Sequence, residues 1–250
     1  MKQIFKPIIG IVFFTTVLGA MGFPESYYKI KNLKEQKREF INILKPLIDE
    51  GNEKILKERF FVERFFQKAI NSAFRALNPG DLKRLLRISK KYRVKNIFDK
   101  NMYLKKIDLI PVPLALVQGA IESGWGKSRF VREANNVFGH WTWGEKGIIP
   151  LGREEGKTHK IRIFRSLQSS VDAYMLNLNR HYAYKSFRNV RLQKSLAGKQ
   201  ITAFEAADTM INYSELREKY VQMLHSMMKE YKLLYYDVAR KHDIQSKVGL

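Results

Sequence analysis

The stretch that decides the fold is ALVQGAIESGWG, residues 115–126. It is a run of small and aliphatic residues with one carboxylate, Glu122, near its end and a glycine-rich turn behind it. Pro113 pre-sets the first turn of a helix, and Gly124 is of the type that ends one. We therefore expect a helix that begins near Pro113 and runs to about Ser123.

The position of Glu122 suits a general acid. The last turn of a helix lies at the negative end of the macrodipole, which disfavours an ionised carboxylate. Apolar neighbours, Ile121 and Trp125, add desolvation in the same direction. Both effects raise the pKa of the carboxyl, as a group that donates a proton near neutrality requires. From the residues alone, the alternative is a structural role in which Glu122 caps backbone or pairs with a basic side chain.

Composition indicates a globular protein with an anionic partner. The 250 residues are 45% hydrophobic, which suffices for a sizeable core. Lys and Arg number 46 against 24 Asp and Glu, so the formal net charge is +22. Cysteine is absent, which excludes disulfides, thiol catalysis and Cys-ligated zinc. The five His show no compact ligand spacing, and we expect neither a metal nor a cofactor.

The N-terminus has the layout of an export signal. MKQIFKPIIGIVFFTTVLGAMG, residues 1–22, places two lysines before an uncharged run that ends in small residues. The stretch 7–24 is long enough for a short membrane span, so an uncleaved inner-membrane anchor is the alternative to cleavage. We expect an exported protein of the periplasm or cell envelope. Its anionic partner is then the cell wall, with a possible second contact at an anionic membrane surface, rather than nucleic acid.

The chain divides into four predicted segments. These are an export signal (1–22), an N-terminal helical region (23–102), a catalytic domain (103–240) and a tail (241–250). The helical region has apolar residues at helical spacing and basic outer faces, for which solvation is the commonest explanation.

Shorter elements are predicted from local signals. Asp81 is expected to cap a helix that follows the break at Asn78. The alternating segment Lys160–Phe164 is expected to form a strand after a turn. Helices are expected again from about 169 to 241.

All three tryptophans follow Glu122 closely. Trp125, Trp141 and Trp143 lie in loop-rich sequence with many Gly and Asn residues. Sugar rings have apolar faces that stack on aromatic rings, so these tryptophans suit a carbohydrate platform. The alternative is ordinary packing in the core.

Several motifs resemble a known family. Residues 115–126, the NNVFG stretch at 135–139 and the Phe-Arg-Ser step at 164–166 resemble the glucosaminidase domain of glycoside hydrolase family 73. With DLIP at 108–111 and NLNRH at 177–181, the chain is similar to the bacterial Bax-type proteins of that group. The resemblance implies a mainly α, lysozyme-like glucosaminidase fold with a small β-hairpin lobe and an N-terminal helical region. It also implies cleavage of the β-1,4 bond between N-acetylglucosamine and N-acetylmuramic acid in peptidoglycan.

The resemblance also implies site residues. The general acid of the family falls on Glu122. A second acid on the hairpin falls on Glu154, with Glu155 as its neighbour and alternative; an exposed turn is the plain structural explanation for both. An important tyrosine in the following helix falls on Tyr184, with Tyr182 as the alternative.

Substrate contacts are expected from the loop and hairpin residues that follow the acid. The expected set is Trp125, Asn136, Phe138, Trp141, Trp143 and Tyr182. The mechanism stays open between retaining, inverting and substrate-assisted routes, which differ in the separation of two carboxyl groups: about 5 Å for a covalent retaining route and roughly 6.5–9.5 Å for inversion.

Two rival functions remain at this level. A lytic transglycosylase-like muramidase would also use one Glu at a helix end. A non-catalytic wall-binding protein would use the charge and the tryptophans for affinity, with Glu122 as a structural residue.

Overall fold

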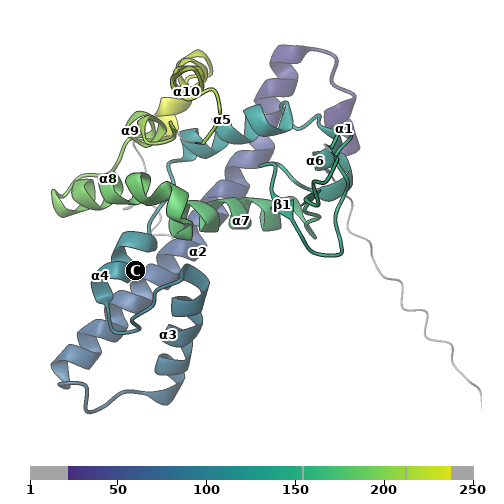
Figure 1. Cartoon of the computed structure of the whole chain (residues 1–250). Helices are drawn as coiled ribbons and strands as arrows, with labels where there is room; N and C mark the ends of the chain where they lie inside the picture. Colours follow the sequence, from purple (N-terminus) through teal and green to yellow (C-terminus); the bar gives the residue numbers. More distant parts are fainter. Residues whose placement is uncertain (1–21, 154, 212, 238–250) are drawn as a thin grey trace, which may run out of the picture.

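A computed structural model describes residues 22–153, 155–211 and 213–237 (Figure 1). The predicted tail, the predicted export signal up to residue 21 and Glu154 lie outside this described part. Within it, no helix combines the length and the apolar character that crossing a membrane requires.

The described chain is mainly α-helical with one small antiparallel pair of strands, which confirms the expected fold class. The elements in order are α1 (Glu25–Tyr28), α2 (Leu33–Asn71), α3 (Pro79–Tyr92), α4 (Lys100–Lys106), α5 (Val112–Ser123), α6 (Arg129–Ala134), β1 (Trp141–Thr142), β2 (Lys160–Ile161), α7 (Leu167–Arg180), the 3-10 turn η1 (Tyr182–Tyr184), α8 (Lys185–Leu196), α9 (Ala203–Asp208), α10 (Glu218–Glu230) and the 3-10 turn η2 (Leu233–Tyr236).

Helix α2 is the longest element, with 39 residues. The side chain of Asn32 caps its start by accepting hydrogen bonds from two backbone N–H groups. It packs against α5 and α7 (Figure 1). A Cβ on Gly51 would lie 2.4 Å from the Met175 sulfur, so any larger residue would force the Met175 side chain or the helices α2 and α7 to shift. The N-terminal helical region therefore shares one hydrophobic core with the rest of the described chain.

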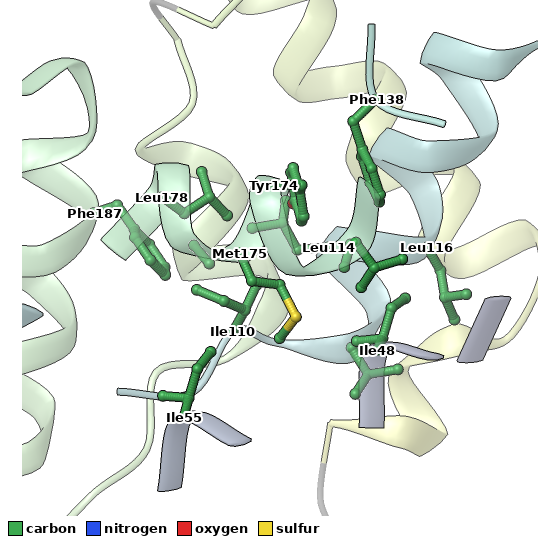
Figure 2. Close-up of a cluster of buried hydrophobic side chains, with 14 of the residues drawn as sticks. Ile48, Ile55, Ile110, Leu114, Leu116, Phe138, Tyr174, Met175, Leu178 and Phe187 are labelled. Carbon is green, nitrogen blue, oxygen red and sulfur yellow. The ribbon is translucent and has the colours of Figure 1, made fainter. Parts of the chain in front are cut away.

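The core lies where α2, α5 and α7 meet (Figure 2). Ile48 and Ile55 of α2, Leu114 of α5 and Met175 of α7 are all 5% exposed or less. Burial of such side chains contributes about 1.5–3 kcal/mol each before entropy is counted. Helix α5 is consequently fixed along most of its length.

The boundaries of α5 match the prediction. The helix ends at Gly124, which has φ +54° and ψ +51° in the left-handed region that glycine tolerates. Pro113 lies in its first turn, where a missing N–H costs nothing. Glu122 therefore occupies the last turn, as expected.

Two local predictions were wrong in detail. Asp81 does not cap α3: the helix begins at Pro79, and the side chain of Asn78 accepts the hydrogen bond from the Asp81 N–H at 3.0 Å. The strand expected over residues 160–164 is only Lys160–Ile161. Phe164 donates its N–H to the carbonyl of Ala134 at the end of α6, which draws the chain out of the sheet.

Candidate active site

A cleft of about 1010 Å³ runs between a helical wall and the β-hairpin lobe. The helical wall comes from α2, the end of α5, α7 and the segments around residues 184 and 213; the hairpin wall comes from residues 138–143 and 162. Among the residues that sequence analysis selected, the following line it: Glu122, Phe138, Trp141, Trp143 and Tyr184. Loops and helix ends far apart in sequence thus meet at one concave surface.

Glu122 faces this cleft without a partner. Within the described part of the chain, no donor hydrogen-bonds to its carboxylate and no cation pairs with it. Burial by surrounding protein raises the pKa of its carboxyl above the ordinary value of 4.5. The structure therefore does not support the alternative in which Glu122 caps backbone or pairs with a basic side chain.

The turn behind Glu122 is held by Ser123. Its buried hydroxyl donates to the carbonyl of Gly119 at 2.5 Å and accepts from the N–H of Gly126 at 2.7 Å. Ser123 is therefore a structural residue that fixes the end of α5, and its hydroxyl does not face the cleft.

Gly139 brings the loop after α6 to the carboxylate. Its φ is +65°, and a Cβ there would lie 3.5 Å from Glu122 Oε2. Backbone of the loop therefore closes one side of the acid. A side chain at this position would be strained by the left-handed backbone conformation.

Asn136 lies behind the cleft wall. Its amide donates to the carbonyls of His140 and Arg162 at 2.8 and 2.9 Å, and its oxygen accepts from the His140 N–H at 2.9 Å. The side chain is only 1% exposed and does not line the cleft. Asn136 thus ties the two arms of the hairpin together, in contrast to the expected substrate contact.

Aromatic side chains form the floor beside Glu122. Phe138 stacks on Tyr174 with ring centroids 3.9 Å apart and an interplanar angle of 8°; both residues are labelled in Figure 2. Tyr184 and Tyr213 also line the cleft, and their ring centroids are 6.1 Å apart. Burial, and then the charge of Glu122, raise the pKa of Tyr184 to about 12 and the pKa of Tyr213 well above its usual value. Both phenols are therefore protonated hydrogen-bond donors at neutral pH.

Hydrogen bonds and ring stacking behind the cleft fix these tyrosines. The hydroxyl of Tyr174 donates to the side-chain oxygen of Gln118, and the amide of Gln118 donates to the hydroxyl of Tyr220 at 3.1 Å. Tyr213 stacks on Tyr220 at 5.4 Å. Gln118 is fully buried in α5, four residues before Glu122. The acid and the tyrosine cluster are therefore positioned by the same helix.

The hairpin carries the exposed tryptophans. Trp141 and Trp143 are 56% and 72% exposed, with ring centroids 6.4 Å apart. Trp141 also stacks on His159 at 4.3 Å. Such open aromatic faces on a cleft wall can contact sugar rings.

Trp125 lies elsewhere, despite its place next to Glu122 in sequence. Its ring packs edge-on against Phe40 at 5.4 Å and Tyr231 at 4.8 Å, with the Lys37 ammonium 5.0 Å from its centroid. It does not line the cleft. Its backbone is left-handed, with φ +56°, and its partly buried ring packs against the core.

Two further residues from the sequence analysis lie outside the cleft. Tyr182, the first residue of η1, is 79% exposed, and its ring is tilted against that of His181 with centroids 4.4 Å apart. Glu155 is exposed in the turn before β2 and does not line the cleft. Glu154 falls outside the described residues.

Sequence reasoning missed the cleft residues Tyr174, Tyr213 and His140. His140 is half-buried, and burial together with the charge of Arg162 lowers its pKa to about 4, so the imidazole is neutral at pH 7. No motif surrounds Tyr213, but Gln118 offered a signal for the cluster. A polar amide within an apolar, fully buried helix needs polar partners facing it.

The chain is similar in sequence to known proteins. Residues 100–233 match the glucosaminidase family, described as mannosyl-glycoprotein endo-beta-N-acetylglucosaminidase. Protein bax of Escherichia coli (strain K12) is 31% identical over 201 residues, which are 78% of this chain and 69% of that protein. The catalytic domain of the autolysin Auto from Listeria monocytogenes aligns with a TM-score of 0.40 and 17% identity, over 68% of this chain and 96% of that one. On the family match and the bax relative, the chain belongs to the glucosaminidase family of glycoside hydrolases.

Proposed function

We propose that this protein is a peptidoglycan hydrolase of the cell envelope, an endo-β-N-acetylglucosaminidase with Glu122 as its general acid. The observation that carries the proposal is an unpaired carboxylate of raised pKa in a cleft whose opposite wall presents two exposed tryptophans. A protonated carboxyl beside stacked sugar rings is the arrangement that protonates a glycosidic oxygen. The family membership supports the same reaction class.

The lack of a second unengaged carboxylate among the described residues of the cleft favours a substrate-assisted route. Among the described residues that line the cleft, the other carboxylate is Asp172, which accepts hydrogen bonds from Lys54 at 2.9 Å and Gln168 at 2.7 Å. Asp172 is thus engaged, and Glu155 lies outside. The 2-acetamido group of N-acetylglucosamine can then serve as the nucleophile. Glu154 is the alternative second acid in this proposal.

The steps follow from that assignment. The acetamido oxygen bonds to C1 of N-acetylglucosamine while the C1–O bond to the leaving sugar breaks. The leaving oxygen takes its electron pair from that bond and its proton from Glu122. Water then attacks C1, its proton passes to the Glu122 carboxylate, and the acetamido group is restored with a reducing N-acetylglucosamine end. The Tyr184 and Tyr213 hydroxyls are proposed to donate to the acetamido group as charge develops.

The test is end-group analysis of wall fragments. The chain without residues 1–22 and its Glu122→Gln variant are incubated with isolated peptidoglycan, and products are identified by mass spectrometry with and without borohydride reduction. Glu133→Gln is the matched control, because Glu133 is an exposed glutamate on α6 that does not line the cleft. We expect reducing N-acetylglucosamine ends from the wild type and the control, and none from Glu122→Gln.

Other outcomes select the rivals. Anhydro-muramic ends would assign the chain to the lytic transglycosylases. Absence of fragments from every variant, with salt-sensitive sedimentation on the wall, would make it a binding protein.

A further inference from the structure

The cleft continues beyond Glu122 into a basic region between α2, α3 and α7. Cationic side chains that line this region are Lys54, Lys91, Arg162 and Arg180. Two of them are neutralised within the protein. Lys54 pairs with Glu50 and Asp172, each at 2.9 Å, and Lys91 pairs with Glu58 at 2.8 Å. These lysines therefore hold the helices together and leave little charge for a ligand.

The two arginines are different. Arg180 donates to the carbonyl of Lys91 at 3.2 Å, and the Arg162 guanidinium lies 4.6 Å from the ring centroid of Phe164. Within the described part of the chain, neither guanidinium has a carboxylate within ion-pair distance. Their charges face the same cleft uncompensated.

The positions of the two arginines suit a ligand that spans the cleft. Arg180 ends α7, next to the end of α3, whereas Arg162 directly follows β2 on the hairpin. Burial and the positive charges of Arg93 and Arg162 lower the pKa of Arg180. A bound anion would offset the repulsion between the Arg180 charge and its cationic neighbours. A guanidinium can bind a carboxylate through two parallel hydrogen bonds.

We propose that Arg162 and Arg180 form a carboxylate-binding subsite for the peptide that is attached to the muramic acid of the glycan substrate. The inference rests on the proposed function, since it names the part of the wall polymer that this region of the cleft holds. In such a substrate the lactyl carboxyl of muramic acid is held in its amide bond to the peptide, so the free carboxyl groups are those of the peptide. The subsite would make the enzyme prefer glycan whose peptides carry free carboxyl groups over glycan whose peptides are amidated. It involves α3 through the Lys91 carbonyl, and α3 lies outside the region matched to the family.

The test is a binding measurement that does not depend on turnover. The probe is a disaccharide tetrapeptide released from peptidoglycan, compared with the same molecule after its carboxyl groups have been converted to amides. Affinities are measured by titration calorimetry for the wild type and for Arg162→Gln/Arg180→Gln. The matched control is Arg75→Gln/Arg165→Gln, which removes the same charge from two exposed arginines that do not line the cleft.

We expect the wild type and the control to bind the free acid about tenfold more tightly than the amide, as a charge-assisted hydrogen bond in a partly open site implies. The double variant should bind both forms equally. Equal affinities in the wild type, or a preference that survives in the double variant, would overturn the subsite.

A second variant guards against loss of folding. Arg180 also donates to the Lys91 carbonyl, so its replacement could disturb folding. The single variant Arg162→Gln is therefore measured as well, because among the described residues the Arg162 guanidinium has a ring contact with Phe164 and no side-chain hydrogen bond. We expect it to lose part of the preference at an unchanged thermal midpoint. If the wild type shows the preference yet releases no fragments with N-acetylglucosamine ends, the proposed function fails and the subsite stands.

Discussion

The two walls of the cleft differ in how they are built. The helical wall consists of buried side chains that contact one another: Gln118 of α5 links Tyr174 and Tyr220, and Tyr213 stacks on the latter. The hairpin wall has strands of two residues each and depends on a few hydrogen bonds around Asn136. On the proposed function, proton transfer would take place at the packed helical wall, and sugar contact would take place at the thin hairpin wall with its exposed rings.

The largest effect is expected from the acid on the helical wall. Glu122→Gln removes the proton while preserving the shape of the side chain, so turnover should fall by about 100- to 10,000-fold. The measurement is the rate at which reducing ends are released from peptidoglycan, with Glu133→Gln as control. A variant that keeps more than a tenth of the wild-type rate would remove Glu122 from the mechanism.

The next effect tests the anchoring of the hairpin wall. Asn136→Ala leaves the His140 N–H and the Arg162 carbonyl without this partner, while the His140 carbonyl keeps the hydrogen bond from the Arg162 N–H. It should lower the free energy of unfolding by about 2–3 kcal/mol. Urea unfolding measures this change. The exposed Asn101→Ala is the control and should stay near zero. A change under 0.5 kcal/mol for Asn136→Ala would show that the hairpin does not depend on this amide.

A smaller effect on rate is expected from the tyrosine cluster. Tyr213→Phe removes a hydroxyl but keeps the ring stacked on Tyr220, so kcat should fall about 10- to 100-fold with little change in KM. The exposed Tyr235→Phe is the control. If KM rises while kcat holds, the hydroxyl contributes to substrate binding in general and not to the transition state.

Replacing the exposed Trp143 and the packed Trp125 should have different effects, the first on substrate binding and the second on stability. Trp143→Ala removes a ring that is 72% exposed and should raise KM about tenfold without changing unfolding. Trp125→Ala removes a ring packed between Phe40 and Tyr231 and should instead cost about 3 kcal/mol of stability. Steady-state kinetics of the purified variants measures the change in KM, and urea unfolding measures the change in stability. The reverse assignment of the two effects would refute the placement of Trp125 in the core.

The smallest effect concerns stability and its dependence on pH. Because the pKa of Glu122 is raised in the folded protein, the unfolded chain loses this proton first as pH rises above about 4.5, and the wild type loses stability there. Glu122→Gln avoids that loss. Its thermal midpoint should equal that of the wild type near pH 4 and exceed it at pH 8. A lower midpoint at pH 8 would mean that the carboxylate is structural.

Features that depend on residues close together in the sequence could be predicted, whereas features that depend on contacts distant in the sequence could not. Glu122 and its helix could be predicted because Pro113, Gly124 and the motif between them are local. The position of Trp125 could not, because it depends on Phe40 and Tyr231, which are distant in sequence. The same holds for α2 as a cleft wall, since its approach to α7 depends on the fit of Gly51 against Met175.

The tyrosines and the loop show the same limit. Tyr213 belongs to no motif and reaches the cleft by stacking on Tyr220. Asn136 was found by motif, but whether its amide faces substrate or backbone depends on the two hairpin arms it joins. Motifs thus locate functional regions, whereas the roles of individual side chains come from tertiary contacts.

The measurement that tests the central claim most directly is the pH dependence of kcat/KM for release of reducing N-acetylglucosamine ends. A proton donor acts only while protonated, so kcat/KM should fall as pH rises through the pKa of Glu122. We expect the midpoint of this fall to lie above 4.5, the ordinary value for a glutamic acid. A rate that falls with a midpoint at or below 4.5, or that does not fall with rising pH, would contradict Glu122 as the general acid.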